Sequence, residues 1–268
     1  MAIKKAAVTV KKSTVKKPIK KSTVKTVSIA AKVGLFNSPL KRAPFIGTLV
    51  AEFIGTFLLA VAVIAGQGQP IIVLFALAGV VLLIGNLSGA HVNPAMSIAA
   101  WVTRKISGLR ALGYVAAQFL GALAALGLLS AFVGGASASS SSAYGAPSLF
   151  VATALPAGKE WYVFFSELIG TAILGLAVAN ALTVVKEKRI TSSLTVGLGI
   201  FVALLFAASA ASYVGGSAII NPSVALSLQA LKWTVWPLVV YVLAPIIGGI
   251  IGFILYDILS VESDGGKD

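Results

Sequence analysis

Long apolar stretches separated by short polar segments dominate the chain. Six of these stretches are about 20 residues long, which is the length that an α-helix needs to cross a hydrocarbon core of about 30 Å. Acidic and basic residues are nearly absent inside them. The pattern therefore predicts six membrane-spanning helices, near Phe45–Ala65, Ile71–Asn86, Ala111–Val133, Trp161–Val185, Thr191–Tyr213 and Val235–Leu259.

The polar landmarks of this pattern occur twice in the same order. "AEFIGT" and "SELIGT" each place a Glu before Ile-Gly-Thr, and an Asn-Pro pair follows 41 residues after Glu52 and 54 residues after Glu167. Each half holds three spans, an odd number, so the second half enters the membrane in the opposite direction. We expect an all-α membrane protein with an inverted 3+3 repeat, repeat one at about 43–134 and repeat two at about 159–260.

Both Asn-Pro pairs lie within apolar sequence, where a surface turn is not expected. Asn is favoured as a helix N-cap and Pro at the first helical position. The pattern predicts helices of some ten residues, from Asn93 to about Thr103 and from Asn221 to about Leu231. At 1.5 Å per residue each is about 15 Å long, or half of the hydrocarbon core. Pro94 and Pro222 would start two re-entrant half-helices.

The inverted repeat brings the two half-helix N-termini together near the membrane centre. Two positive dipole ends then point to one place. The side-chain carbonyls of Asn93 and Asn221 serve as caps, which leaves their NH2 groups as donors. Such a site favours polar, uncharged solutes and opposes cations.

The charge is unevenly distributed along the 268 residues. The whole chain has a formal net charge of +13, and residues 1–42 hold twelve Lys or Arg and no acid. We expect a basic, disordered tail at 1–42, a channel domain at 43–260 and a C-terminal tail at 261–268. Contact of the Lys-rich tail with anionic lipid is an open alternative. Nucleic-acid binding is not expected, because no aromatic residue interleaves the Lys runs.

The same charges predict the orientation. With both termini in the cytoplasm, nineteen basic residues lie on the inner side and only Lys159 and Lys232 lie outside. The positive-inside rule therefore places both termini in the cytoplasm.

The ordered motifs resemble those of the major intrinsic protein family, the aquaporins and glycerol facilitators, over roughly residues 45–260. The matching stretches are "AEFIGT", "SGAHVNPA", "YVAAQFLGA", "SELIGT", "INPS" and "APIIGG". The resemblance implies six tilted helices, two half-helices, one pore per subunit and a homotetramer. It also implies that Asn93 and Asn221 are the central donors of the pore.

The sequence departs from the family at the outer filter. Where the family has Arg, this chain has Val224, and spacing from the two Asn residues places the other filter positions at Val73, Ser209 and Ala218. All four are small and uncharged, so we expect a wider, less polar filter. Other positions give opposing indications about the solute. The short second re-entrant loop and Ala225 resemble those of water channels, whereas Val242 stands where water channels usually have Trp. Water should pass, and glycerol, urea and ammonia remain open.

Two acids and one histidine lie within the apolar regions. Glu52 and Glu167 could relay protons, but we favour a structural role in which each accepts N–H bonds from a re-entrant loop. His91 could gate the pore or bind a metal, yet without Cys or a neighbouring carboxylate it more readily braces the first loop. Gln118 is expected to bond between helices.

Three functions are weighed from these features. A passive channel for small neutral solutes is favoured by the paired Asn-Pro segments. An ion-coupled transporter would use Glu52 and Glu167, and a membrane-adhesion protein would use the Lys-rich tail. No nucleophile–base set or phosphate-binding loop is present, so neither an enzyme nor a cofactor is expected. The chain has no cysteine, and no metal site is predicted.

Overall fold

The computed structural model describes residues 44–137, 148–183 and 189–264. The predicted basic tail and most of the Ser-rich segment before residue 148 lie outside these ranges. The described residues belong to one compact unit. The helices described below all belong to that unit.

The described residues contain six helical segments long and apolar enough to cross a membrane. The prediction of six spans is therefore confirmed, although the ends of the helices differ from the predicted ends by a few residues. The first five segments are α2 (Pro44–Ala65), α3 (Pro70–Ser88), α5 (Gly108–Ser137), α6 (Glu160–Thr183) and α7 (Arg189–Ser212). The last consists of α9 (Val235–Leu238), the π-helical turn η3 (Val239–Leu243) and α10 (Ala244–Asp264).

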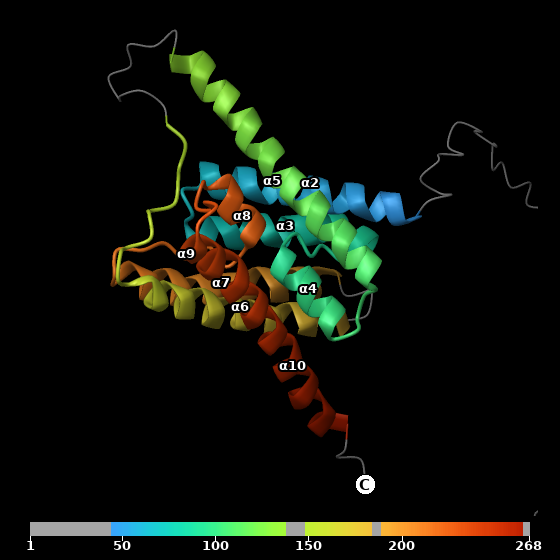
Figure 1. Ribbon diagram of the computed structural model, residues 1–268. Helices are drawn as coiled ribbons and strands as arrows, with labels where there is room; N and C mark the ends of the chain where they lie inside the picture. Colours follow the sequence, from blue (N-terminus) through green and yellow to red (C-terminus); the bar gives the residue numbers. More distant parts are fainter. Residues whose placement is uncertain (1–43, 138–147, 184–188, 265–268) are drawn as a thin grey trace, which may run out of the picture. The chain divides into compact units, whose positions relative to one another are not determined.

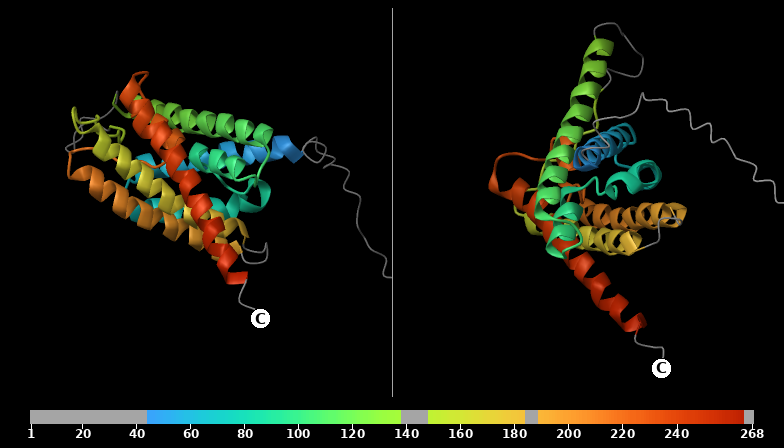
Figure 2. Two further views of the ribbon diagram at one scale, coloured as in Figure 1. Left: turned by 60° about the horizontal axis from the view of Figure 1, so that its bottom comes forward. Right: turned by 90° about the vertical axis from the view of Figure 1, so that its right-hand side faces the viewer.

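The internal repeat is visible in the packing. In the first half α2 packs against α3 and α5, and in the second half α6 packs in the same way against α7 and α10. Helices α3 and α7 join the halves by packing on each other. In Figure 1, α2 and α6 run in opposite directions, while α5 and α10 cross the other long helices obliquely. Figure 2 shows the same crossing from two other sides.

Glycine permits the close helix crossing in each half. A Cβ atom on Gly121 of α5 would clash with the backbone carbonyl of Phe53 on α2. A Cβ atom on Gly248 of α10 would clash with the carbonyl of Leu168 on α6. The two crossings are equivalent positions of the repeat, and small residues let the backbones approach there.

Two short helices follow the re-entrant segments, α4 (Pro94–Val102) and α8 (Pro222–Ser227). Their predicted starts are confirmed, but α8 ends four residues before the predicted Leu231. Both helices end in a Schellman motif, with a residue in the left-handed region at Arg104 (φ 62°) and at Gln229 (φ 58°). The N–H of the next residue then bonds back to Ala100 and Ala225, respectively, which closes the last turn.

The last span is not a uniform α-helix. Pro237 removes one backbone donor near its start, and the Ala244 N–H bonds to the carbonyl of Val239, five residues earlier. This i→i+5 bond defines the π-helical turn η3, and such turns arise where a helix accommodates a local insertion. The buried Tyr241 belongs to this turn.

Candidate functional site

The two half-helices begin at Asn side chains that cap them. The Asn93 Oδ1 atom accepts a hydrogen bond of 2.9 Å from the N–H of Ala95. The Asn221 Oδ1 atom accepts one of 3.1 Å from the N–H of Ser223. Both Asn residues have extended backbones, and Pro occupies the first helical position after each. The local sequence thus forms the expected capped starts.

The two Asn side chains also connect the repeats to each other. The Asn93 Nδ2 atom donates to the carbonyl of Ile220, 2.9 Å away. In the same way the Asn221 Nδ2 atom donates to the carbonyl of Val92, also 2.9 Å away. This hydrogen bond uses one of the two N–H hydrogens of each amide.

Glutamates hold the two re-entrant segments. Glu52 accepts hydrogen bonds from the backbone N–H groups of His91 (3.0 Å) and Val92 (2.7 Å). Glu167 accepts from those of Ile219 (2.6 Å) and Ile220 (2.7 Å). Both carboxylates are fully buried. Backbone donors without a helix or sheet partner are thereby satisfied in each half.

The residue before each Asn has an unusual backbone. Val92 has φ 41° and Ile220 has φ 52°, although β-branched residues rarely adopt the left-handed region. In each residue the N–H bonds to a Glu and the carbonyl accepts from the Asn of the other repeat. Four hydrogen bonds thus hold two strained residues in place beside the two Asn caps.

The first re-entrant segment has an additional polar network. Gln118 donates to Glu52 (2.8 Å) and to Ser97 (2.9 Å), and the Nδ1 atom of His91 lies 3.2 Å from the same Ser97 hydroxyl. His91 also packs edge-on against Tyr114 at 5.3 Å. This network joins the α4 helix to α2 and α5.

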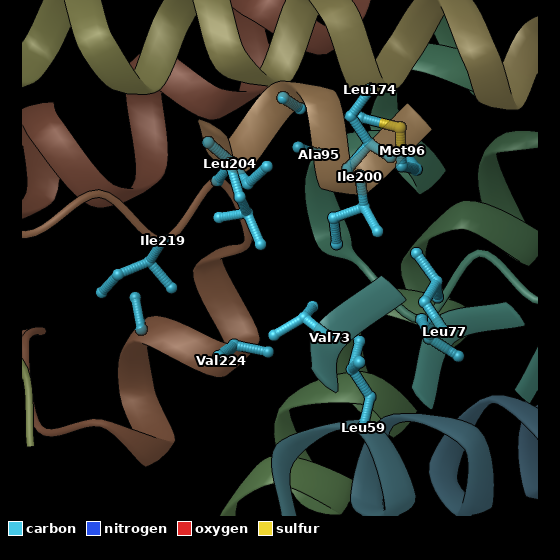
Figure 3. Close-up of a cluster of buried hydrophobic side chains, with 14 of the residues drawn as sticks. Leu59, Val73, Leu77, Ala95, Met96, Leu174, Ile200, Leu204, Ile219 and Val224 are labelled. Atoms are coloured by element: carbon cyan, nitrogen blue, oxygen red, sulfur yellow. The ribbon is translucent and has the colours of Figure 1, made fainter. Parts of the chain in front are cut away.

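A cavity of about 220 Å³ lies next to α8, and we call it the Val224 cavity. It is lined by residues of α2, α3, α7, α8 and the segment before Asn221, together with Phe150 and Ala152. Val224 and Val73 point toward each other there (Figure 3). Asn221 lies in its wall, and no charged residue of the described chain is among its lining residues. Since one water takes about 30 Å³ of liquid, several waters fit.

A second cavity, of about 200 Å³, lies at the ends of α3 and α6 and the start of α7. We call it the Arg189 cavity. The segment before Asn93 contributes Gly89 and Ala90 to its wall. Each cavity is therefore bordered by the re-entrant segment of a different repeat.

The family model described as "Major intrinsic protein" matches residues 39–256. The chain belongs to the major intrinsic protein family.

Curated relatives within the family carry different solute names. The chain is 31% identical over 238 residues to aquaporin NIP1-3 of Oryza sativa subsp. japonica, which covers 83% of this chain and 77% of the relative. It is 29% identical over 213 residues to the glycerol uptake facilitator protein-like 6 of Lactiplantibacillus plantarum, with coverage of 78% and 92%.

A solved structure of this family has the same fold. The X-ray structure of the aquaglyceroporin from Plasmodium falciparum matches with a TM-score of 0.63 and 24% identity, covering 83% of this chain and 100% of that chain. The all-α fold with six spans is thus that of the major intrinsic protein family. The protein is an integral, multi-pass membrane protein.

The expected filter positions of this family member do not all face the Val224 cavity. Val73, Ala218 and Val224 line it, whereas Ser209 does not. Ser209 is exposed on α7, and the preceding residue, Ala208, lines the cavity instead. Each residue of an α-helix is turned by about 100° from the last, so a slip of one position exchanges an inward side chain for an outward one. On α7, Ala208 and not Ser209 therefore forms part of the wall of this cavity.

Two tyrosines that support the re-entrant segments are absent from the sequence predictions. The Tyr114 hydroxyl donates to the carbonyl of Ser88 (2.8 Å), and the Tyr241 hydroxyl donates to that of Ser217 (3.2 Å). The two pairs hold equivalent places in the repeat. Their near-equal offset in sequence, 127 and 129 residues, was a signal that could have found them.

Proposed function

We propose that the protein is a passive channel for water and small uncharged solutes, which pass between the two half-helix N-termini. The observation that carries the proposal is the pair of cross-bonded Asn caps, one of which lies in the wall of the Val224 cavity. Each Asn amide keeps one N–H hydrogen for a solute oxygen, and both helix dipoles oppose a cation at this place.

The buried acids favour a channel over an ion-coupled transporter. Both oxygens of Glu52 and of Glu167 accept hydrogen bonds from backbone N–H groups. A carboxylate with both oxygens engaged by backbone donors is occupied in holding the re-entrant segment and is poorly placed to contact a passing solute or ion. We assign Glu52, Glu167, His91 and Gln118 to the support of the re-entrant segments.

We further propose that Val73, Ala208, Ala218 and Val224 form the outer filter. Their side chains are aliphatic and present no donor to the solute. Such a filter discriminates by size more than by hydrogen bonding, so we infer that glycerol, urea and ammonia pass beside water. The two relatives named for water and for glycerol transport are consistent with this range.

Purified protein in lipid vesicles provides the test. After an osmotic step, light scattering gives the permeability to water, and the same method with glycerol or urea gradients gives the solute permeability. We expect the protein to raise the permeability to water and to at least one of the other solutes. Vesicles that are no more permeable than protein-free vesicles would overturn the proposal.

We also propose a homotetramer with both termini in the cytoplasm. Many large apolar side chains on the outer faces of the helices are exposed in the single chain, for example Leu83, Leu112 and Phe132, and would be covered by lipid or by neighbouring subunits. Native mass spectrometry in detergent is expected to give the mass of four chains. Trypsin added to sealed, right-side-out cells should leave the Lys-rich tail intact; a single-chain mass or a cleaved tail would contradict the respective assignment.

A further inference from the structure

The Val224 cavity and the Arg189 cavity, taken as the two mouths of the proposed pathway, differ in charge. Among the described residues, those lining the Val224 cavity carry no charge, whereas Arg189 lines the Arg189 cavity without a carboxylate in the same wall. Ser192 and Asn86 are its other side chains with donors or acceptors. Of the described residues that line the two cavities, the charged one is thus in the cavity opposite to Val224.

The guanidinium of Arg189 is held at this mouth by a neighbour from the other repeat. With its amide oxygen turned toward Arg189, Asn86 accepts hydrogen bonds from the guanidinium. Asn86 lies near the end of α3 and Arg189 in the first turn of α7. A guanidinium has five N–H donors, more than one amide oxygen can use, so donors remain for a solute in the cavity.

The inverted repeat places equivalent positions of the two halves in the two cavities. The Val224 cavity is lined by Val73 in the first turn of α3, by Ala208 near the end of α7 and by Ala218. The Arg189 cavity has the equivalent places occupied by Arg189 in the first turn of α7, by Asn86 near the end of α3 and by Ala90. Ala90 and Ala218 lie three residues before Asn93 and Asn221. The mouth with Arg189 is therefore the repeat-related counterpart of the outer filter.

We propose that Arg189, held by Asn86, is a second filter that rejects cations at the inner mouth and supplies the charge that the outer filter lacks at Val224. This inference rests on the proposed channel function. Barriers in series along one pathway each limit the flux of an ion, so a positive charge at either mouth opposes cations. A neutral solute does not meet this electrostatic barrier, and it gains hydrogen-bond donors from the guanidinium.

The test compares Arg189→Gln and Arg189→Lys with the wild type in lipid vesicles. Proton flux is read with an internal pH dye under an imposed potassium diffusion potential, and water permeability is read by light scattering. We expect Arg189→Gln to raise the proton leak about three- to tenfold, the range for one charge near a wet mouth. Arg189→Lys should stay near the wild type, and the water permeability of the same vesicles shows whether each variant still forms a conducting channel.

Two further variants separate a local effect of Arg189 from a general effect of losing one positive charge. Arg110→Gln removes an exposed positive charge that lines neither cavity, and it should leave the proton leak unchanged. Adding Val224→Arg to Arg189→Gln should lower the leak again, because a cation is restored in series. A normal leak in Arg189→Gln vesicles that conduct water would overturn this inference and leave the channel function standing. Wild-type vesicles that conduct no water would instead overturn the proposed function itself.

Discussion

Each Asn at a half-helix start makes two kinds of hydrogen bond in different directions. Its oxygen caps its own helix, and its nitrogen donates to the backbone of the other repeat. The capping bond could be predicted from the Asn-Pro pair, because N-cap preference is local. The cross-repeat bond could not, because it joins residues 127 and 129 positions apart. In the proposed pathway, each amide therefore has one N–H hydrogen left for a solute and not two.

Val224 is the residue through which the outer filter can be tested. Replacing it with Arg adds a long, charged side chain to a cavity of about 220 Å³. We expect Val224→Arg to lower glycerol permeability about tenfold and water permeability much less, because the narrowed pocket discriminates by solute size. Both permeabilities are measured by light scattering in the same vesicles.

Val224→Met is the matched control for this substitution. It adds similar length without charge, so it separates narrowing from electrostatics. If glycerol and water fall equally in Val224→Arg, or if neither changes, residue 224 does not line the constriction.

Glu167 provides a test of the bracing role at the same scale. In Glu167→Gln one carboxylate oxygen becomes an NH2 group that faces a backbone N–H of Ile219 or Ile220. An unpaired buried donor costs about 1–3 kcal/mol, so we expect a lower melting temperature in detergent. Glu160→Gln at the start of the same helix is the control, and its side chain is not fully buried. The result would favour the transporter instead if Glu167→Gln is as stable as the wild type, and if solute uptake depends on a proton gradient in the wild type but not in the variant.

The filter position on α7 shows where residue-level prediction reached its limit. Val73, Ala218 and Val224 could be placed by counting from the Asn-Pro pairs, and all three line the cavity. Counting back to α7 crosses the irregular residues between Ser212 and Asn221, whose conformations are not evident from the residue types. A shift of one residue there exchanges Ala208, which lines the cavity, for Ser209, which does not.

At the scale of elements, the spans could be predicted closely and the short helices less so. Apolar length alone fixed the six spans, because lipid requires a continuous helix of known extent. The early end of α8 depends on a left-handed Gln229, and the π-helical turn after Pro237 depends on the accommodation of one extra residue. Neither the end of α8 nor the π-helical turn is marked by a recognisable residue pattern. At the end of α8, for example, the left-handed residue is Gln229 and not the Gly that usually occupies such a position.

Helix packing gives the prediction at this scale. Gly248→Ala places a Cβ atom against the carbonyl of Leu168, so α10 and α6 must separate. We expect a loss of about 1–3 kcal/mol in stability, typical of overpacking, measured by unfolding in mixed detergent micelles. Gly127→Ala on α5 is the control: its Cβ would meet open space, so it should be neutral or stabilising by up to about 1 kcal/mol. Equal effects from the two substitutions would contradict the close crossing.

At the scale of the whole molecule, the two halves share one plan and differ in its polar residues. Each half has its Glu brace, its Tyr brace, its capped half-helix and its cavity. The first half adds His91 and Gln118, and the second contributes Arg189 to the Arg189 cavity. This symmetry could be predicted from the repeated motifs, whereas the solute range depends on side chains that differ between halves.

The central claim is that solutes pass passively between the half-helix N-termini. The most direct measurement is the osmotic water permeability of vesicles containing the wild-type protein, recorded with and without an imposed proton gradient. The account predicts a permeability well above that of protein-free vesicles and the same value under both conditions. A permeability equal to that of protein-free vesicles, or one that appears only with the gradient, would contradict it.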